Sequence, residues 1–224
     1  QVYEKKLPDN IVSKVVQMLG WLKAMCHPDG EIAFFNDSTL GVAPTLYDLL
    51  DYSNRLNITY IDSKVNQLIY LKESGYIRVN RKEVAIIADI AEIGPNYIPG
   101  HGHADVLSFE LSLFGKRVIV NSGTSLYGEG SERLRQRGTS SHSTVVIDNQ
   151  NSSEVWAGFR VARRAKIFNV ETSIDNGKIY LSAHHDGYKR LSGSPIHHRS
   201  WVLSEGLIEV IDHISGKGIH DIEV

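Results

Sequence analysis

The spacing of apolar residues changes once along this 224-residue chain, and the change limits the folds that the chain can adopt. Apolar residues recur at helical spacing in two stretches, 10–25 and 44–56, and the first stretch is followed by a turn, His27-Pro-Asp-Gly30. After about Lys64 the repeat shortens to two residues, which is the repeat of a half-buried strand. The pattern predicts a helical hairpin followed by a β-rich domain.

The β-rich part consists of short candidate strands that are separated by Gly, Asn, Asp and Ser turns. They cover residues 68–71, 76–79, 84–90, 106–114, 117–121, 143–148, 161–171, 178–184, 198–204 and 207–213, with a last one near His220. Many short strands of this kind are typical of an antiparallel β-sandwich or open barrel. One helical hairpin cannot bury both of its faces alone. We therefore expect the remnant of a helical domain at 1–64 and a β-sandwich at 65–224 that is truncated at its C-terminus.

Charge and cysteine content exclude several classes of protein. Lysine and arginine total 24 and aspartate and glutamate total 26, so no basic field is present to hold nucleic acid or an anionic membrane. Cys26 is the single cysteine, which excludes an intramolecular disulfide and a thiolate-rich metal site. No apolar stretch approaches the roughly 20 residues that span a bilayer. We expect neither nucleic acid nor a membrane as a partner.

A loop rich in proline and glycine, residues 94–105, carries the first group of reactive side chains. It ends in His101-x-His103-x-Asp105, just before a candidate strand. In extended backbone, residues two apart share a face, so the three side chains can converge on a metal ion or form an acid/base pair. A single histidine here would more often be an ordinary hydrogen-bonded loop residue. Two in tandem before a carboxylate favour a functional site.

A second polar cluster lies between Asn121 and His142. It contains Arg133 and Arg137, and it ends with His142 at the start of an apolar run. Functional residues are common on such loops. The planar guanidinium groups are suited to bind carboxylate or sulfate, although a solvated or structural role fits the sequence equally well.

These motifs resemble those of the heparinase II/III-like polysaccharide lyases. The resemblance extends from about Asp29 to the end of the chain and rests on Pro99-Gly-His-Gly-His-Ala-Asp-Val-Leu-Ser-Phe109, followed by 120–124, 137–145, 155–160 and His198-Arg199; the run 28–38 is also similar. It implies an antiparallel β-sandwich preceded by the end of an (α/α) toroid. It also implies β-elimination on an acidic, uronate-containing polysaccharide.

The resemblance assigns a divalent metal, usually zinc, to part of the site. His103 and His142 match histidines that bind a structural metal in the family. The third ligand there is usually an aspartate, whereas Asn121 stands at the matching position of this chain. An amide oxygen is a weaker ligand than a carboxylate, so this substitution predicts reduced metal affinity unless Asp105 supplies the missing charge.

The resemblance also assigns the chemistry of cleavage. His101 matches the catalytic histidine, and Tyr127 falls near a tyrosine that lines the cleft. Arg133 and Arg137 are the candidate ligands of substrate carboxylates or sulfates. The family's carboxylate-neutralising Asn or His, and a further Tyr, belong to toroid segments that precede this chain, so we expect the chain alone to be inactive. The substrate class predicts a periplasmic or secreted protein, and heparan sulfate, alginate and bacterial surface polysaccharides all stay open.

Two other functions are compatible with parts of the sequence. A cupin-like metal enzyme would combine His101 and His103 with Glu110, but Glu110 lies an odd number of residues after His103 and would face the other way in an uninterrupted strand. A non-catalytic carbohydrate-binding sandwich would use exposed aromatic side chains. The candidates for that role are Trp156, Tyr180, Tyr188 and Trp201.

Overall fold

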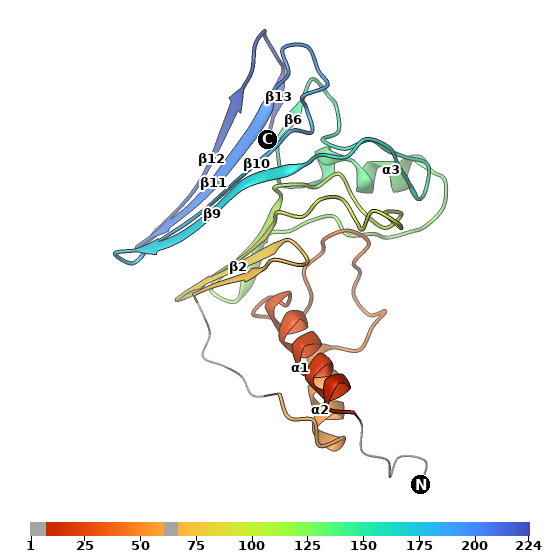
Figure 1. Cartoon of the computed structure of the whole chain (residues 1–224), viewed down its shortest axis with the longest axis vertical. Coiled ribbons are helices and arrows are strands. Elements are labelled where there is room, and N and C mark those ends of the chain that lie inside the picture. The colour runs from red at the N-terminus through yellow and green to blue at the C-terminus, as the bar shows by residue number, and fades with distance from the viewer. Residues whose placement is uncertain (1–7, 61–66) are drawn as a thin grey trace.

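The helical hairpin predicted from the sequence is present at the N-terminal end of the protein (Figure 1). The computed structural model describes residues 8–60 and 67–224. Helices α1 (Asp9–Ala24) and α2 (Leu46–Arg55) form the hairpin. A capping box fixes the start of α2, because Thr45 and Asp48 each accept a backbone N–H from the other. Within residues 8–60 and 67–224, no helix is long and apolar enough to cross a membrane.

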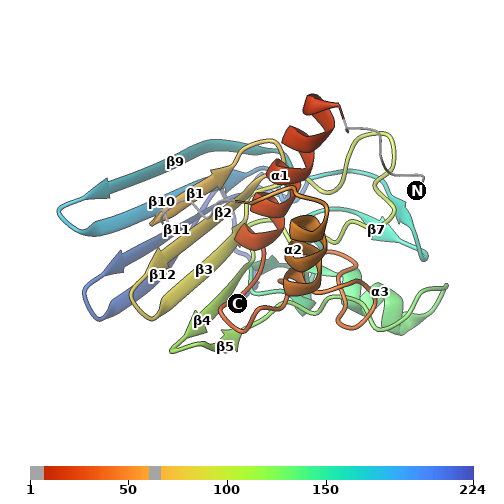
Figure 2. The same ribbon diagram turned by 90° about the horizontal axis from the view of Figure 1, so that it is seen from below.

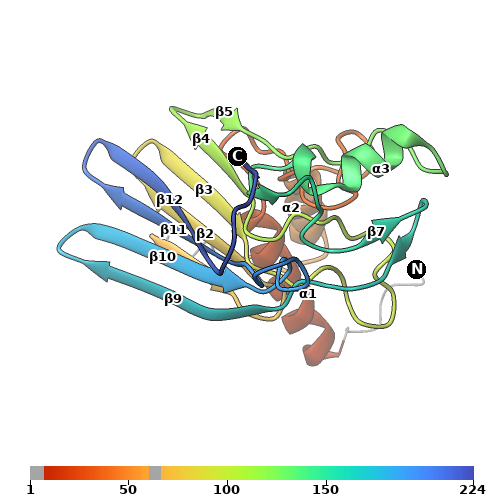
Figure 3. The same cartoon turned by 90° about the horizontal axis from the view of Figure 1, so that it is seen from above.

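The predicted antiparallel sandwich is confirmed. Its first sheet has the order β1-β2-β3-β4-β5, formed by Leu68–Leu71, Tyr76–Arg81, Val84–Asp89, Phe109–Leu113 and Lys116–Ile119. Its second sheet has the order β12-β11-β10-β9, formed by Leu207–Ser215, Ile196–Ser204, Lys178–His185 and Ile167–Asp175. All of these pairings are antiparallel between strands that follow one another in the chain. Figure 3 shows the long strands of the second sheet side by side. The predicted boundary near residue 64 lies outside the described residues.

The main hydrophobic core lies between the two sheets. Ile77, Ile86 and Phe109 contribute from the first sheet, and Leu181 and Trp201 contribute from the second. Each of them is at most 5% exposed, because alternate residues of every strand face the opposite sheet. The ring of Trp201 meets the ring of Phe109 edge to face at 6.1 Å between centroids.

The segment that follows α1 covers the other face of the first sheet. Met25, Ala33 and Phe35 pack there on Tyr76 of β2 and Ile87 of β3. Figure 1 shows the two helices below this sheet, and in the view from below in Figure 2 they lie in front of it. The helical part of the chain is therefore attached to the sandwich through residues 25–35, and this attachment places the next residues, Asn36 and Asp37, at the edge of the sandwich.

The segment that connects the last strand of the first sheet, β5, to β9 of the second sheet differs most from the sequence prediction. It forms α3 (Ser131–Arg137), the 3-10 turn η1 (Thr139–Ser141), and three very short strands, β6 (Val146–Ile147), β7 (Val155–Trp156) and β8 (Arg160–Val161). β7 pairs with β8, and β6 pairs with the C-terminal β13 (Ile222–Glu223). The single strand predicted over 161–171 is wrong, since β8 and β9 are separate. The prediction missed α3 because its inward side carries arginine and glutamine instead of an apolar stripe.

Candidate active site

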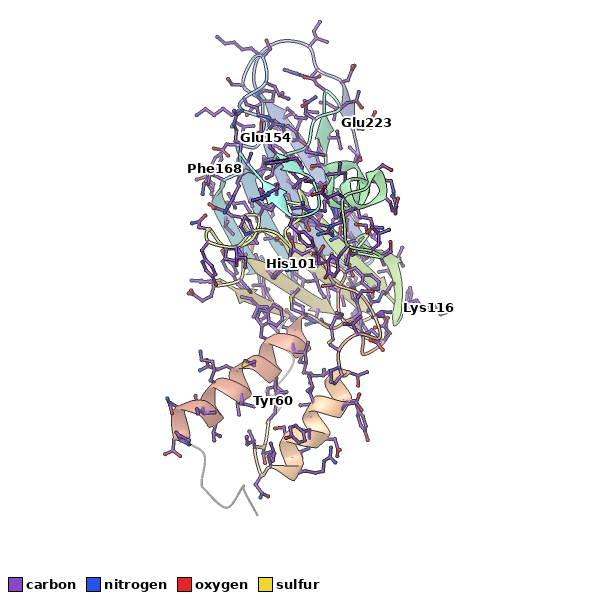
Figure 4. The ribbon with its side chains drawn as sticks, turned by 90° about the vertical axis from the view of Figure 1, so that its right-hand side faces the viewer. Tyr60, His101, Lys116, Glu154, Phe168 and Glu223 are labelled. Carbon is purple, nitrogen blue, oxygen red and sulfur yellow. The ribbon has the colours of Figure 1, made fainter. Side chains whose placement is uncertain are left out.

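The loop at 94–105 presents His101 to solvent and His103 to the protein interior. Their side chains are 63% and 0% exposed. Gly102 separates them and permits a tight turn, because a Cβ there would lie 2.6 Å from Ile93 Cγ1 and 3.2 Å from Pro99 O. Figure 4 shows His101 between the helical hairpin and the part of the sandwich that carries Glu154. The two histidines therefore have different surroundings, one at the surface and one in the interior.

Asp37 contacts both of these histidines, a role that no sequence pattern predicted. Its carboxylate lies 2.7 Å from Nδ1 of His101 and 2.9 Å from Nε2 of His103. Arg133 contacts both of its oxygens, through Nη1 to Oδ1 and through Nη2 to Oδ2 at 2.8 Å. Burial alone would raise the pKa of Asp37, but the hydrogen bonds from His103, Arg133 and His101 outweigh it and hold the pKa well below its usual range. Asp37 is therefore a charged carboxylate at neutral pH.

Arg133 and Arg137 are buried on α3, contrary to the expectation that they bind substrate. Both are 0% exposed. Besides Asp37, Arg133 donates to Gly158 O at 3.0 Å. Arg137 donates to Gly102 O from Nε and Nη2, at 3.1 and 3.0 Å. Their positions correct the substrate-binding assignment, because both guanidinium groups donate to other parts of the protein. Arg133 links α3 to Asp37, and Arg137 links α3 to the loop that carries His101.

His103 and His142 come together, as their proposed metal-binding role requires. Their ring centroids are 5.3 Å apart. Nδ1 of His103 and Nε2 of His142 are buried and have no hydrogen-bond partner among the described residues. Burial, with His103 nearby, lowers the pKa of His142 to about 3, so its ring is neutral at neutral pH, as a metal ligand must be. Two open imidazole nitrogens fit a metal ion.

Asn121 and Asp105 fit the metal less well. The Oδ1 atom of Asn121 lies 2.9 Å from Nδ1 of His142, and its Nδ2 donates to Ser108 at 3.2 Å, so both ends of the amide are in use. Asp105 has a buried Oδ2 with no partner in the described chain. Burial raises the pKa of Asp105 to about 6, and it also raises the pKa of its neighbour Asp89. Within the described ranges, no three His, Cys, Asp or Glu side chains form a group that could hold a metal.

Two aromatic rings flank His101 at the surface. Tyr127 and Phe159 meet the imidazole edge to face, with centroids at 6.0 and 5.7 Å. They are 56% and 44% exposed, and their own rings are 5.6 Å apart. Arg133 lies beneath both of them, 5.4 Å from each centroid. The three rings are therefore in mutual contact and exposed together at the surface. Tyr127, which the resemblance assigned to the cleft, lies beside His101, and no role for Phe159 was predicted.

The structure also addresses the alternative functions. Glu110 is fully buried, 2.6 Å from His27 Nε2, and it accepts the backbone N–H groups of Phe34 and Asn121 at 2.7 and 3.0 Å. It lies among these partners and not with His101 or His103, which removes the donor set of a cupin-like site. Of the aromatic candidates for sugar stacking, Tyr188 and Trp201 are 0% exposed and belong to the core. Trp156 is exposed, and Tyr180 is half-buried.

The comparisons with known proteins agree with this fold. Residues 64–224 match the model of the heparinase II/III-like C-terminal family, and the chain belongs to that family. No curated protein matches the chain at the sequence level.

Solved structures of similar fold come from heparinases. The crystal structure of heparinase III aligns with a TM-score of 0.69 at 16% identity, over 95% of this chain and 36% of that one. A heparinase III described as the BT4657 gene product gives 0.70 at 20% identity, over 96% and 34%. The heparan sulfate lyase HepC from Pedobacter heparinus gives 0.71 at 18% identity, over 96% and 34%. The chain thus spans about a third of the length of each of these proteins.

Proposed function

We propose that this chain is part of a polysaccharide lyase that cleaves an acidic, uronate-containing polysaccharide by β-elimination. The observation that carries the proposal is the setting of His101. Its imidazole is hydrogen-bonded through Nδ1 to Asp37, is 63% exposed, and contacts the exposed rings of Tyr127 and Phe159. Family membership and the likeness to heparinase III and a heparan sulfate lyase support the same class of reaction. A glycosaminoglycan of the heparan sulfate type is therefore the first substrate to test.

The proposed reaction assigns a proton to each of two side chains. His101 accepts the proton from the carbon that bears the uronate carboxylate, and the C–H electrons form the new double bond of the uronate ring as the glycosidic C–O bond at the neighbouring carbon breaks. The departing oxygen keeps the electron pair of that bond and takes a proton, for which the Tyr127 phenol is the nearest candidate donor. General acid and base groups of this kind contribute roughly 10²- to 10⁴-fold each. Positive charge at the substrate carboxylate would stabilise the enolate-like intermediate.

We also propose that His103 and His142 hold a divalent metal, zinc, through their open nitrogens. A structural zinc site takes four ligands, and these two imidazoles supply two of them. The metal would stabilise the interior of the site, since His103 and Asp37 are in contact and Asp37 holds His101. Asn121 then acts by orienting the His142 ring, in the way that outer hydrogen-bond partners orient metal-binding histidines.

A lyase assay on the natural protein tests the reaction. The unsaturated uronate that β-elimination creates absorbs ultraviolet light, and hydrolysis creates no such product. Heparan sulfate, alginate and a neutral polysaccharide are compared, with His101→Ala as the test variant and His213→Ala as the control, because His213 is exposed on β12. We expect product from an acidic substrate, and a loss with His101→Ala only. Cleavage without an unsaturated product, or full activity of His101→Ala, would reject the proposal.

Metal analysis of the purified protein tests the second proposal. We expect about one zinc per chain in the unaltered protein, little in the double variant of His103 and His142, and a lower melting temperature after chelation. His184 and His198 provide a matched control, because they are a second histidine pair with rings 4.2 Å apart, at a different place in the sandwich. Equal zinc in both double variants, or no change on chelation, would contradict the assignment.

A periplasmic or secreted location of the protein stays a prediction.

A further inference from the structure

One carboxylate contacts both histidines of the His-x-His motif, and this arrangement has a chemical consequence. Asp37 is 6% exposed, and Arg133 donates to both of its oxygens in a paired ion contact, so the group is an ionised carboxylate. An ionised carboxylate only accepts hydrogen bonds, so every nitrogen that faces it must carry a hydrogen. The nitrogens that face it are Nδ1 of His101, Nε2 of His103 and the Arg133 guanidinium. The two histidines therefore present opposite ring nitrogens to the same group.

This constraint determines which ring nitrogen each neutral histidine leaves open. His101 with its hydrogen on Nδ1 has the lone pair on Nε2, on the exposed part of the ring. His103 with its hydrogen on Nε2 has the lone pair on Nδ1, which is buried and lacks a partner among the described residues. One histidine is thus prepared to accept a proton from outside, and the other presents its open nitrogen inside the protein, where the His142 ring lies 5.3 Å away between centroids.

Asp37 is held rigidly enough to impose this arrangement. The neighbouring Asn36 has the left-handed backbone conformation, with φ of 55°, and its Oδ1 accepts the backbone N–H of His103 at 3.1 Å. Phe34 O accepts from Gly123 N at 3.1 Å, and Ser38 O accepts from Thr124 N at 3.0 Å. The segment that carries Asp37 is therefore attached on both sides to the sandwich, and backbone hydrogen bonds of this kind fix the carboxylate relative to the imidazoles.

Arg133 balances the charge of Asp37 and explains why an arginine is buried here. It contacts both carboxylate oxygens in the paired geometry that arginine favours, and it also lies under the rings of Tyr127 and Phe159. The arginine keeps Asp37 ionised, and it occupies acceptor positions on each oxygen. Each oxygen therefore meets one arginine N–H and one imidazole N–H.

We propose that Asp37 is the positioning residue of the site: its carboxylate holds His101 in the Nδ1–H form, which makes Nε2 the proton-accepting atom, and holds His103 in the opposite form. The catalytic consequence rests on the proposed lyase function, but the hydrogen positions do not. Outer groups that orient a reactive imidazole typically contribute 10- to 100-fold to activity.

The hydrogen positions can be measured directly in the unaltered protein. Long-range proton–nitrogen NMR spectra of histidine side chains distinguish the two neutral forms, and they are recorded in alkaline solution, where the imidazoles are neutral. We expect the Nδ1–H form at His101 and the Nε2–H form at His103. His101 predominantly in the Nε2–H form would overturn the proposal, and this measurement does not require a variant that folds.

Asp37→Asn tests the role of the carboxylate. The variant keeps the size of the side chain, but its amide has one accepting oxygen and one NH₂ group. Whichever way the amide turns, its NH₂ group faces one imidazole and one guanidinium N–H, so one histidine must change its form. Asp148→Asn is the matched control, because Asp148 accepts from Nδ1 of His220 at 2.7 Å in a separate aspartate–histidine pair. We expect changed spectra at the site histidines with Asp37→Asn and unchanged spectra there with Asp148→Asn.

Turnover of the natural protein completes the test. Asp37→Asn should lower kcat roughly 10- to 100-fold with KM little changed, while Asp148→Asn retains the full rate. Unchanged turnover in a folded Asp37→Asn variant would overturn the positioning role. If the spectra are as expected but no variant or unaltered protein forms an unsaturated product, the proposed lyase function fails and the assignment of the hydrogens to the two rings remains.

Discussion

Replacing Asp212 by asparagine should destabilise the sandwich and loosen the site at once. Asp212 on β12 is opposite Arg199 on β11, and the guanidinium donates to its two oxygens at 2.7 and 2.8 Å. His197 contacts the same carboxylate at 2.6 Å. Arg199 is 1% exposed and also donates from Nη1 to Leu107 O at 2.9 Å and to Ser143 O. The pair therefore joins the second sheet to the two segments that carry the site.

The expected cost follows from leaving a buried guanidinium without its counter-charge. Breaking a buried ion pair by removing one partner costs about 3–5 kcal/mol. Arg199 keeps its two carbonyl acceptors and Asp212 is partly exposed, so the lower value of about 3 kcal/mol is expected. With a urea dependence of about 2 kcal/mol per M, the midpoint of unfolding should fall by about 1.5 M.

The assay is urea unfolding of the two proteins at neutral and acidic pH. Burial would raise the pKa of Asp212, but the hydrogen bonds from His197 and Arg199 outweigh it and lower the pKa below its usual value of 3.8. A lowered carboxylate pKa gives stability that is present above the unfolded pKa and is lost as the pH falls through the folded pKa. The difference between the two proteins should therefore be full at pH 7 and should shrink below about pH 4.

Glu209→Gln is the control for this experiment, because Glu209 is exposed on the same strand. Surface changes of that kind usually alter stability by less than about 0.5 kcal/mol. If Asp212→Asn costs less than about 1 kcal/mol, or no more than the control, the buried pair does not hold the sheet to the site as argued.

Three further outcomes are expected. His101→Ala should lower turnover about 10²-fold or more with an unchanged melting temperature, because the side chain is 63% exposed; a variant that unfolds while keeping its specific activity would make the histidine structural. Leu181→Ala, at a fully buried core position, should cost about 2–5 kcal/mol by calorimetry, whereas Ile219→Ala, fully exposed, should cost almost nothing. The hydrogen bond to Asp148 raises the pKa of His220. The stabilising effect of this bond is therefore present below the usual histidine pKa of 6.5 and is lost as the pH rises through the pKa of the folded state. Asp148→Asn should remove this pH dependence from the melting temperature.

Much of the fold follows from local patterns in the sequence. The helical repeat before Leu56 and the alternation after Leu68 predicted the hairpin and most of the long strands correctly, with β9 as the exception, because each pattern reflects burial of one face of a single element. The irregular chain between the sheets was predicted poorly. There the 131–137 helix buries Arg133, Gln136 and Arg137 instead of an apolar stripe, so its sequence lacks the apolar repeat that predicted the hairpin helices.

The candidate site was predicted in its parts but not in its connections. The His-x-His motif, Tyr127 and the family resemblance marked the region, and the structure brings His101 close to Tyr127 and His103 close to His142. The sequence fitted a substrate-binding role and a structural role of Arg133 and Arg137 equally well. It predicted no role for Asp37 or Phe159. Burial of a charged side chain depends on its partner, and that partner is not visible in a local pattern.

The sequence by itself determined the two helices of the hairpin and most strands of the two sheets, the absence of a net basic charge, and which loop carries reactive histidines. Only the tertiary structure decided what each charged group does. Asp37 lies 64 residues before His101 and 96 residues before Arg133, yet it is bonded to both. Periodicity reports the burial of neighbouring residues along one element, whereas a hydrogen bond depends on positions in space that the folding of the whole chain sets.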